Sequence, residues 1–197
     1  QRERKQNFTP QGIIDACDAS LQRLQTDRID LYQLHNPRMD VIRDDDVIAT
    51  LLKLVDQGKV RYFGAALGPA FNLRQIEEAL AVCELPYHSV QIIYNMYEQA
   101  IGQAIFETAD QTQTGVLVRV PHCSGILEDN LTEDTEFPGW DHRAHRPRQW
   151  LIDGLKKNES IRFLVHEQRT MAQAAMKFCL DQPRVATTLP NIYDETQ

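Results

Sequence analysis

Paired cysteines are missing from this sequence of 197 residues. Its four cysteines, Cys17, Cys83, Cys123 and Cys179, lie far apart, and none of them belongs to a CxxC pair. Zinc cages and disulfide frameworks need closely spaced or matched cysteines, so this spacing argues against both. Unpaired thiols are typical of a reducing compartment, and we expect the protein to be cytoplasmic.

Long apolar runs and an excess of positive charge are absent as well. No apolar segment approaches the roughly 20 residues of a membrane-spanning helix, and the first residues lack a secretory signal pattern. Lysine and arginine number 21 against 28 aspartate and glutamate residues, which gives a formal net charge of -7. We therefore expect no membrane and no nucleic-acid partner. The apolar fraction of 42% is typical of a globular domain.

What the sequence does contain is an alternation of helical and strand-like segments. Thr9 and Pro10 are typical of a helix N-terminus, and apolar residues recur after them at three- and four-residue spacing. We predict helices at 10–24, 46–57, 73–83, 101–110 and 170–181, and strands at 29–35, 61–67, 89–95, 115–120 and 185–189. The gap between 121 and 184 is longer than the others, so extra structure is inserted there.

This alternation predicts an α/β fold with a parallel sheet, either doubly wound or a (β/α)8 TIM barrel. Neither GxGxxG nor GxxxxGK[ST] follows any predicted strand, which weakens the nucleotide-binding doubly wound alternative and favours the barrel. Five strands cannot close a barrel, and bare edge strands are a liability. We therefore expect residues 1–197 to form a single domain that is incomplete at both ends, with self-pairing as the alternative.

The segment RIDLYQLHNP, residues 28–37, carries a histidine where a predicted strand ends. Leu31, Gln33 and His35 share one face, because successive side chains of a strand point to opposite sides. Pro37 cannot donate to the ladder and ends the strand. Parallel α/β proteins place their chemistry at such strand ends. His35 is therefore the candidate catalytic residue, and a histidine that merely caps the strand is the structural alternative.

Five segments together resemble the aldo-keto reductase family, in the family's order and spacing. They are SLQRLQTDRIDLYQLHNP (20–37), LLKLVDQGKVRYFG (51–64), VQIIYN (90–95), GVLVRVPHCSGIL (115–127) and AQAAMKFCLDQPRVATTLP (172–190). Each match is weak alone, but the set is specific. The resemblance implies a TIM barrel, of which this chain would supply strands four to eight. It also implies reduction of an aldehyde or ketone by hydride from NADPH, or alternatively from NADH.

The resemblance also assigns roles to individual residues. His35 matches the histidine that orients the carbonyl, while a tyrosine tuned by a lysine and an aspartate protonates the alkoxide. Those three partners precede Gln1 in the family pattern, so we expect them outside the residues given. Gln91 matches the glutamine that binds the nicotinamide carboxamide through a donor and an acceptor. A strand glutamine satisfied by backbone groups is the alternative for Gln91.

The remaining cofactor contacts are implied for the second half of the chain. Arg119 stands where many members carry an aromatic that stacks on the nicotinamide; a guanidinium plane can also stack, and a salt bridge is the alternative. The loop expected to embrace the pyrophosphate contains Val120, Pro121, His122, Ser124 and Gly125. His122 occupies a position where leucine is common, so a surface location is its alternative. Asn191 replaces a family glycine after the last strand, and Gln197 matches a residue near the adenosine 2′-phosphate.

Two features depart from the family pattern or lie outside it. Ala66 and Leu67 stand where many members have Ser-Asn, which motivates a non-catalytic cofactor-binding or regulatory relative as the alternative function. The run HRAHRPRQW, residues 142–150, has no third ligand at metal spacing, so we expect no metal site. Its basic cluster, Arg143 to Arg148, suggests a small anionic ligand, with a solvated loop or substrate lid as the other interpretations. The expected partner is a small carbonyl compound, and the sequence predicts no oligomeric state.

Overall fold

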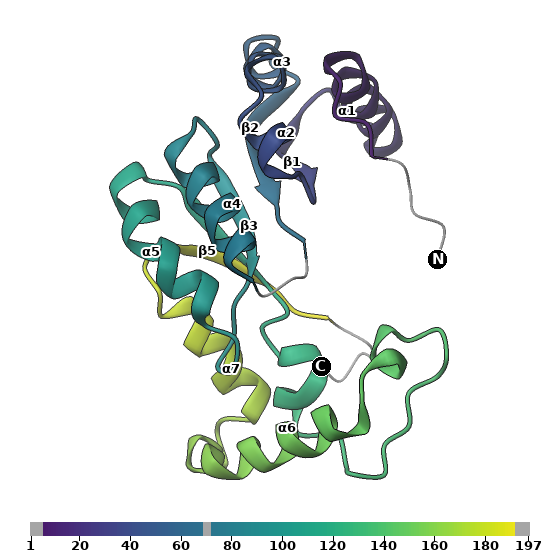
Figure 1. The fold of residues 1–197 in the computed structure, drawn as a ribbon, viewed down its shortest axis with the longest axis vertical. Helices are drawn as coiled ribbons and strands as arrows, with labels where there is room; N and C mark the ends of the chain where they lie inside the picture. Colours follow the sequence, from purple (N-terminus) through teal and green to yellow (C-terminus); the bar gives the residue numbers. More distant parts are fainter. Residues whose placement is uncertain (1–5, 69–71, 192–197) are drawn as a thin grey trace. The chain divides into compact units, whose positions relative to one another are not determined.

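The computed structural model describes residues 6–68 and 72–191, in which helices and strands alternate along the chain (Figure 1). The strands are β1 (Ile29–His35), β2 (Val60–Ala66), β3 (Ser89–Ile93), β4 (Gly115–Arg119) and β5 (Val185–Leu189). The α-helices are α1 (Pro10–Leu24), α2 (Met39–Ile42), α3 (Asp45–Asp56), α4 (Leu73–Glu84), α5 (Ala100–Thr112), α6 (Arg148–Ser160) and α7 (Met171–Leu180). Short 3-10 helices η1 (Cys123–Glu128), η2 (His142–His145) and η3 (Arg162–Leu164) follow β4.

The strands form one sheet in chain order, β1-β2-β3-β4-β5. β1 pairs with β2 and β2 pairs with β3, both in parallel. A doubly wound sheet reverses its strand order at a switch point, whereas a (β/α)8 barrel keeps strands in sequence. The sequential order therefore confirms the predicted parallel α/β sheet and agrees with part of a barrel.

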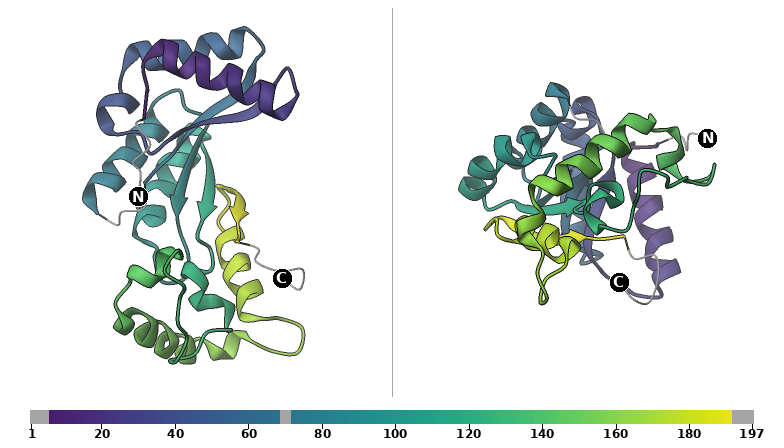
Figure 2. Two further views of the ribbon diagram at one scale, coloured as in Figure 1. Left: turned by 90° about the vertical axis from the view of Figure 1, so that its right-hand side faces the viewer. Right: turned by 90° about the horizontal axis from the view of Figure 1, so that it is seen from below.

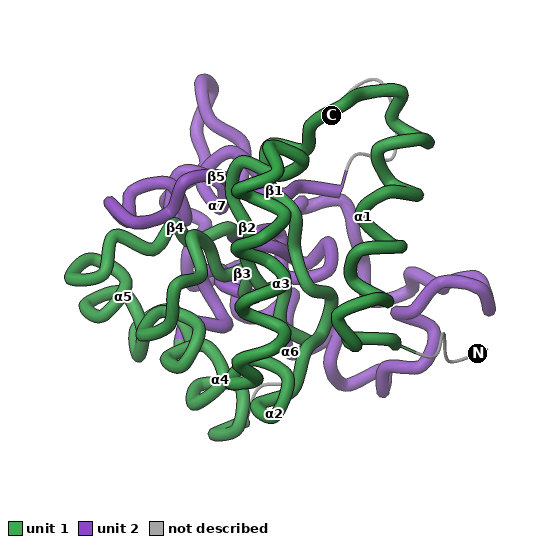
Figure 3. Tube along the Cα trace, turned by 90° about the horizontal axis from the view of Figure 1, so that it is seen from above, with its two compact units in different colours: residues 1–92, 100–117 green, residues 93–99, 118–197 purple. Residues whose placement is uncertain are grey.

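The chain divides into two compact units, coloured separately in Figure 3. Unit 1 comprises Gln1–Ile92 and Ala100–Leu117, and unit 2 comprises Ile93–Gln99 and Val118–Gln197. Unit 1 holds β1, β2 and β3 with the helices that connect them, and unit 2 holds the segments around α6 and α7.

In unit 1, helix α1 buries residues of the apolar stripe that the sequence predicted. Thr9 caps the helix by accepting from the Gly12 backbone N–H at 3.2 Å, and Cys17 is among the residues buried beneath it. The Tyr32 hydroxyl donates to the Ile13 carbonyl at 3.2 Å and so joins β1 to α1. Helix α1 also contacts α3, beside which it lies in Figure 2. Tyr32 thus faces the helices, opposite to the face that carries Gln33 and His35.

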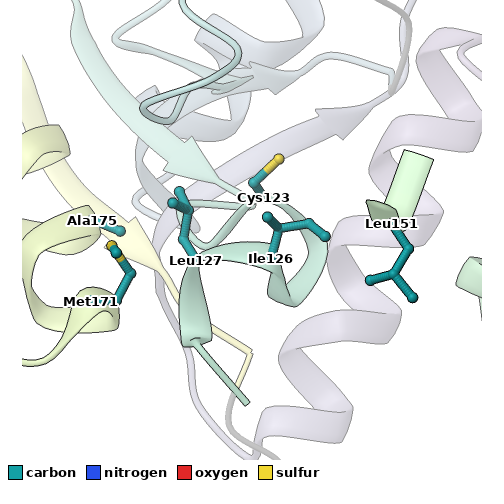
Figure 4. Packing of buried hydrophobic residues seen from close by; sticks show 6 residues of the cluster. All are labelled: Cys123, Ile126, Leu127, Leu151, Met171 and Ala175. Carbon is teal, nitrogen blue, oxygen red and sulfur yellow. The ribbon is translucent and has the colours of Figure 1, made fainter. Parts of the chain in front are cut away.

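In unit 2, an apolar cluster joins η1, α6 and α7 (Figure 4). Its buried members are Cys123, Ile126, Leu127, Leu151, Met171 and Ala175. Helix α6 is part of the extra structure expected between 121 and 184, where no helix was predicted before residue 170. The sequence hid it because only Leu151, Gly154 and Asn158 of its 13 residues are buried, too few for a clear apolar stripe.

Two smaller differences concern element boundaries. Helix α2 has only four residues and was not predicted. Strand β3 ends at Ile93 rather than Asn95, because the Asn95 backbone turns back to pair with Glu98. No helix of the described residues is both long enough and apolar enough to cross a membrane.

Candidate active site

The C-terminal ends of three adjacent strands in unit 1 bring the first predicted site residues into one row. In the parallel register, His35 on β1 is paired with Ala66 on β2, and Ala66 is paired with Gln91 on β3. Residues in register across a sheet point to the same face, so these three side chains share a face. The structure thus places His35 and Gln91 on the same side of the sheet, two strands apart.

His35 lies where β1 stops and is exposed. The next residue, Asn36, has a left-handed backbone with φ of 54°, and its N–H donates to the Ala66 carbonyl at 2.7 Å. Asparagine tolerates this conformation better than most residues do. The turn therefore ends the strand directly after His35 and leaves the imidazole at the open end of the sheet, as the sequence predicted.

Gln33 and Gln91 form the polar part of this face. The Gln91 side-chain amide donates to Gln33 Oε1 at 3.1 Å, which excludes the alternative that backbone groups alone satisfy Gln91. Gln33 Nε2 is buried and has no hydrogen-bond partner among the described residues. A buried donor without a partner is costly, and the carbonyl oxygen of a ligand amide would satisfy it. The pair therefore fits a carboxamide such as that of nicotinamide.

Small residues keep this face open between the two glutamines. A Cβ on Gly64 would lie 2.1 Å from Ser89 Oγ and 2.6 Å from the Ser89 carbonyl oxygen, so only glycine allows β2 and β3 to approach here. Ala66 adds only a methyl group between His35 and Gln91 in the row. The Ala66 and Leu67 side chains, which depart from the Ser-Asn of the family pattern, are both buried, and neither can donate a hydrogen bond.

In unit 2, the loop after β4 holds most of the other predicted cofactor residues. Val120, Cys123, Ser124 and Gly125 all have positive φ, at 57°, 50°, 56° and 96°. For a β-branched residue such as Val120 this conformation costs about 1–3 kcal/mol and is a sign of a functional constraint. His122 has φ of −90° and Cys123 has φ of 50°, so the backbone passes from the right-handed to the left-handed region between them. Anion-binding nests have this backbone geometry. The Cys123 and Gly125 N–H groups donate within the loop, to the Val120 and His122 carbonyls at 3.1 and 3.0 Å, so a phosphate-bearing ligand would be bound by the other N–H groups of the turn.

Asn95 holds this loop in place, a role that the sequence analysis missed. Its side-chain amide donates to the Val120 carbonyl at 3.0 Å and to Glu98 Oε2 at 2.6 Å. Its Oδ1 accepts from the backbone N–H groups of Tyr97 and Glu98, both at 3.0 Å. Asn95 is fully buried. The signal was its position as the last residue of VQIIYN, directly beyond a strand, where a buried amide needs several partners.

The burial of His122 excludes the alternative that this histidine lies on the surface. His122 is buried rather than on the surface, and its Nδ1 lies 3.0 Å from Glu128 Oε1. Its Nε2 is buried and unpaired within the described part of the chain. The other side of the loop contacts Arg143, whose Nη1 donates to the Ser124 carbonyl at 3.4 Å. A Cβ on Gly125 would lie 2.9 Å from that Nη1, so glycine is also required by packing.

The remaining residues predicted to contact the cofactor differ in how far they are buried. Arg119 is half-buried at the end of β4, Pro121 is buried, and Ser124 is half-buried. Asn191 is exposed after β5. Gln197 lies outside the described residues.

The buried thiols and phenols are arranged for packing rather than for proton transfer. Burial, together with the nearby Glu98 carboxylate, raises the pKa of Cys123 to about 12, so its thiol stays protonated. Burial also raises the pKa of Tyr32 and of Tyr97 to about 12. Within the described residues, no group of three histidine, cysteine or acidic side chains could hold a metal ion.

Comparison with known proteins decides the family. The sequence model of the Aldo/keto reductase family matches residues 1–197. The chain belongs to the aldo/keto reductase family. Aldo-keto reductase YhdN of Bacillus subtilis is 30% identical over 183 residues, which cover 87% of this chain and 51% of that protein. Probable aldo-keto reductase 1 of Glycine max is 26% identical over 188 residues, or 92% of this chain and 52% of that protein.

Solved aldo-keto reductases share the fold. The holo form of AKR11C1 from Bacillus halodurans matches with a TM-score of 0.72 at 24% identity, covering 96% of this chain and 59% of that one. The glycerol dehydrogenase AKR11B4 from Gluconobacter oxydans matches with a TM-score of 0.70 at 27% identity, covering 93% and 56%. The chain spans about half the length of the curated aldo-keto reductases that it matches. Its sheet therefore corresponds to part of an aldo-keto reductase (β/α)8 barrel.

Proposed function

We propose that this aldo-keto reductase, as an intact protein that also supplies the family's aspartate, tyrosine and lysine, reduces an aldehyde or ketone to the alcohol, with NADPH as the hydride donor and NADH as the less favoured one. The observation that carries the proposal is the row of His35, Ala66 and Gln91 at the open ends of three parallel strands, with Gln33 bonded to Gln91. One end of the row offers an exposed imidazole, and the other offers amide groups. These are the groups that a carbonyl substrate and a carboxamide need.

His35 would act on the carbonyl oxygen. When bound, the nicotinamide supplies a hydride, and negative charge then develops on that oxygen. An N–H donor placed at this oxygen before the reaction lowers the barrier, because it stabilises the charge where it forms. The proton that completes the alcohol would come from the tyrosine that the family supplies from its earlier strands. His35 is exposed at the strand end and is therefore accessible to a substrate.

Gln33 and Gln91 would fix the carboxamide. The unpaired Gln33 Nε2 would donate to the carboxamide oxygen, and Gln91 Oε1 would accept from the carboxamide nitrogen. This pairing would orient the ring without any charged group. The pair would thus restrict which face of the ring is presented to the substrate, since a carboxamide can satisfy both amides in few orientations.

In unit 2, the loop of left-handed residues would bind the pyrophosphate. We propose that the backbone N–H groups of Val120 and His122, with the Ser124 hydroxyl, act as donors, while Pro121 and Gly125 shape the turn. The Gly125 N–H itself donates to the His122 carbonyl at 3.0 Å. Arg119 would stack on a planar ring. Asn191 and Gln197 would contact the adenosine end. The four cysteines are free thiols, which supports the cytoplasmic location expected from the sequence.

A non-catalytic cofactor-binding relative is the second candidate function, and Ala66 and Leu67 are the observation that favours it. Both are buried and apolar where many family members offer hydrogen-bonding side chains. A protein of this kind would bind the nucleotide without turning it over.

Two measurements on the purified protein separate the candidates. Fluorescence titration with NADPH and NADH reports binding, and the fall in NADPH absorbance with a panel of simple aldehydes and ketones reports turnover. We expect both binding and turnover. Binding without turnover on any carbonyl compound supports the second candidate, and absence of binding contradicts both. Gln91→Leu should weaken nucleotide binding about tenfold or more, because it leaves Gln33 and the carboxamide without an amide partner.

A further inference from the structure

Unit 2 contains a pocket that the proposed reaction does not use. Its volume is about 270 Å³, and it lies between the segment around Phe137, the end of η2 and the start of α6. Three arginines line it, Arg143, Arg146 and Arg148, together with the aromatic side chains of Phe137 and Trp150. It therefore collects the basic cluster that the sequence analysis left open as a contact for an anionic ligand.

Arg143 is already committed to a structural role. It forms a bidentate ion pair with Asp141, with Nη2 2.7 Å from Oδ2 and Nε 3.1 Å from both carboxylate oxygens. Its guanidinium carbon lies 4.4 Å from the centre of the Phe137 ring. The ion pair holds the pKa of Asp141 below its usual range, because Arg143 stabilises the carboxylate. Arg143 therefore forms a wall of the pocket, with its charge neutralised.

Arg146 differs in what its guanidinium contacts. Its central carbon lies 4.6 Å from the centre of the Trp150 ring, and no carboxylate of the described residues forms an ion pair with it. Stacking uses the flat face of a guanidinium and leaves the N–H groups at its edge directed away from the ring. That edge has the geometry that binds carboxylate or phosphate oxygens in pairs. Arg146 is thus an exposed cation next to Trp150 whose N–H donors form no ion pair with a carboxylate of the described residues.

Arg148 adds a second positive charge with no carboxylate partner among the described residues. Its Nη1 donates to the Thr135 carbonyl at 2.6 Å and its Nη2 donates to the Glu133 carbonyl, both of which are neutral acceptors. Helix α6 begins at this residue, and its N-cap, Pro147, provides no side-chain acceptor. The positive end of the helix dipole therefore adds to the field of the two arginines. Glu136 also lines the pocket and opposes this field. Glu136, Arg146 and Arg148 are all exposed, so water screens the repulsion and the attraction alike.

Much of the remaining lining is apolar, with Thr135 as a polar exception. Leu151 is 2% exposed at the base, and the Phe137 and Trp150 rings lie next to each other with centroids 6.4 Å apart. A carboxylate or phosphate group alone would leave much of this volume unfilled, because the pocket has room for several water-sized molecules. An organic body on the anion would cover the apolar surface and gain from its burial.

We infer that this pocket binds a small organic oxyanion, with a carboxylate or phosphate head on Arg146 and an aromatic or aliphatic body against Trp150 and Leu151. Arg148 and the N-terminus of α6 add positive electrostatic potential, and Arg143 forms one wall of the pocket. The inference does not depend on the proposed reductase activity, since every contact belongs to unit 2 and requires neither nucleotide nor carbonyl compound.

Isothermal titration calorimetry of the protein without nucleotide tests this site with four probes: phenyl phosphate, benzoate, inorganic phosphate and benzyl alcohol. We expect phenyl phosphate and benzoate to bind, each at least about tenfold more tightly than benzyl alcohol, because the head group makes charge-assisted hydrogen bonds. We also expect each to bind more tightly than inorganic phosphate, and affinity to fall as salt is raised. If benzyl alcohol binds as tightly as the two aromatic anions, the pocket does not select an anion and the inference is wrong. If inorganic phosphate binds as tightly as they do, the organic part of the ligand does not contribute to binding and that part of the inference is wrong.

Substitutions at Arg146 locate the binding. Arg146→Gln should weaken both aromatic anions about tenfold or more, and Arg146→Lys should give an intermediate affinity because lysine keeps the charge but not the planar edge. Lys156→Gln is the matched control, since it removes the same charge from an exposed position of α6 outside the pocket. Circular dichroism checks that each variant is folded. Unchanged affinity in Arg146→Gln, or an equal loss in Lys156→Gln, contradicts the inference.

Discussion

The two units build their candidate sites in different ways. In unit 1 the polar side chains project from regular strands, and the ladder register sets their positions: His35, Ala66 and Gln91 form one row. In unit 2 the corresponding element is a loop in which Val120, Cys123, Ser124 and Gly125 have positive φ. That loop depends on the buried side chain of Asn95.

This difference shows what each part tolerates. A strand end presents whatever side chain occupies it, so His35 can change without loss of the fold, whereas the spacing between strands cannot. A loop held in a costly backbone conformation needs its supports intact, because the surrounding structure must offset the strain. The predictions below test this contrast, from the largest expected effect to the smallest.

Gly64→Ala should destabilise unit 1 most, by about 3 kcal/mol in the free energy of unfolding. The added Cβ would lie 2.6 Å from the Ser89 backbone oxygen, so β2 and β3 would have to move apart. Urea denaturation measures the loss. Gly139→Ala is the matched control, because a Cβ there meets open space. If both variants lose the same stability, close strand spacing is not what requires Gly64.

Asn95→Asp should cost about 2 kcal/mol and weaken NADPH binding, because it removes the donor to the Val120 carbonyl and sets one carboxylate against another. Glu98→Gln, added to Asn95→Asp, should restore part of the stability by supplying an amide donor to the new aspartate. A double-mutant cycle by urea denaturation measures the coupling. Additive losses would show that the Asn95–Glu98 contact does not support the loop.

The Asp141–Arg143 pair gives unit 2 a dependence on acid. The ion pair lowers the pKa of Asp141, so its contribution to stability is fully present above the ordinary aspartate value and is lost as the pH falls through the lowered pKa. Wild-type protein should therefore lose stability below about pH 4. Asp141→Asn should cost about 1 kcal/mol at neutral pH and show less of this acid-dependent loss.

Asp134→Asn is the control for this experiment, since Asp134 is exposed. It should leave both the neutral stability and the slope against pH unchanged. Urea midpoints at several pH values measure both quantities. Identical slopes in wild-type protein and Asp141→Asn would contradict a stabilising role for the ion pair.

The ion pair between Arg61 and Asp30, at 3.2 Å on the surface of unit 1, should matter least. Both side chains are at least half exposed, so Asp30→Asn should change the free energy of unfolding by less than about 1 kcal/mol. Raising the salt concentration should reduce the difference further, because salt screens exposed charges. A larger loss would mean that the edge of β1 is held by charge rather than by its backbone ladder.

The sequence was sufficient where periodicity and register decide the structure. The alternation of Leu31, Gln33 and His35 predicted the face that the strand pairing confirms, and the apolar spacing predicted α1, α4 and α7 within a few residues. Helix α6 was missed because its buried residues are few and one of them is glycine. The burial of His122 could not be predicted, because it depends on a contact with Glu128 in an irregular loop. The position of Asn95 beyond the strand indicated that it needs partners, but not that Val120, 25 residues away, is one of them.

The kinetics of His35→Ala test the central claim most directly, namely that the strand-end row in unit 1 is the carbonyl site. The kcat for aldehyde reduction should fall about 100- to 1,000-fold, as for loss of one donor to a developing oxyanion, while the Kd for NADPH and the unfolding midpoint stay unchanged. His145→Ala, an exposed histidine in η2, should match wild-type protein. An unchanged kcat in His35→Ala, or a loss explained entirely by weaker NADPH binding, would contradict the account.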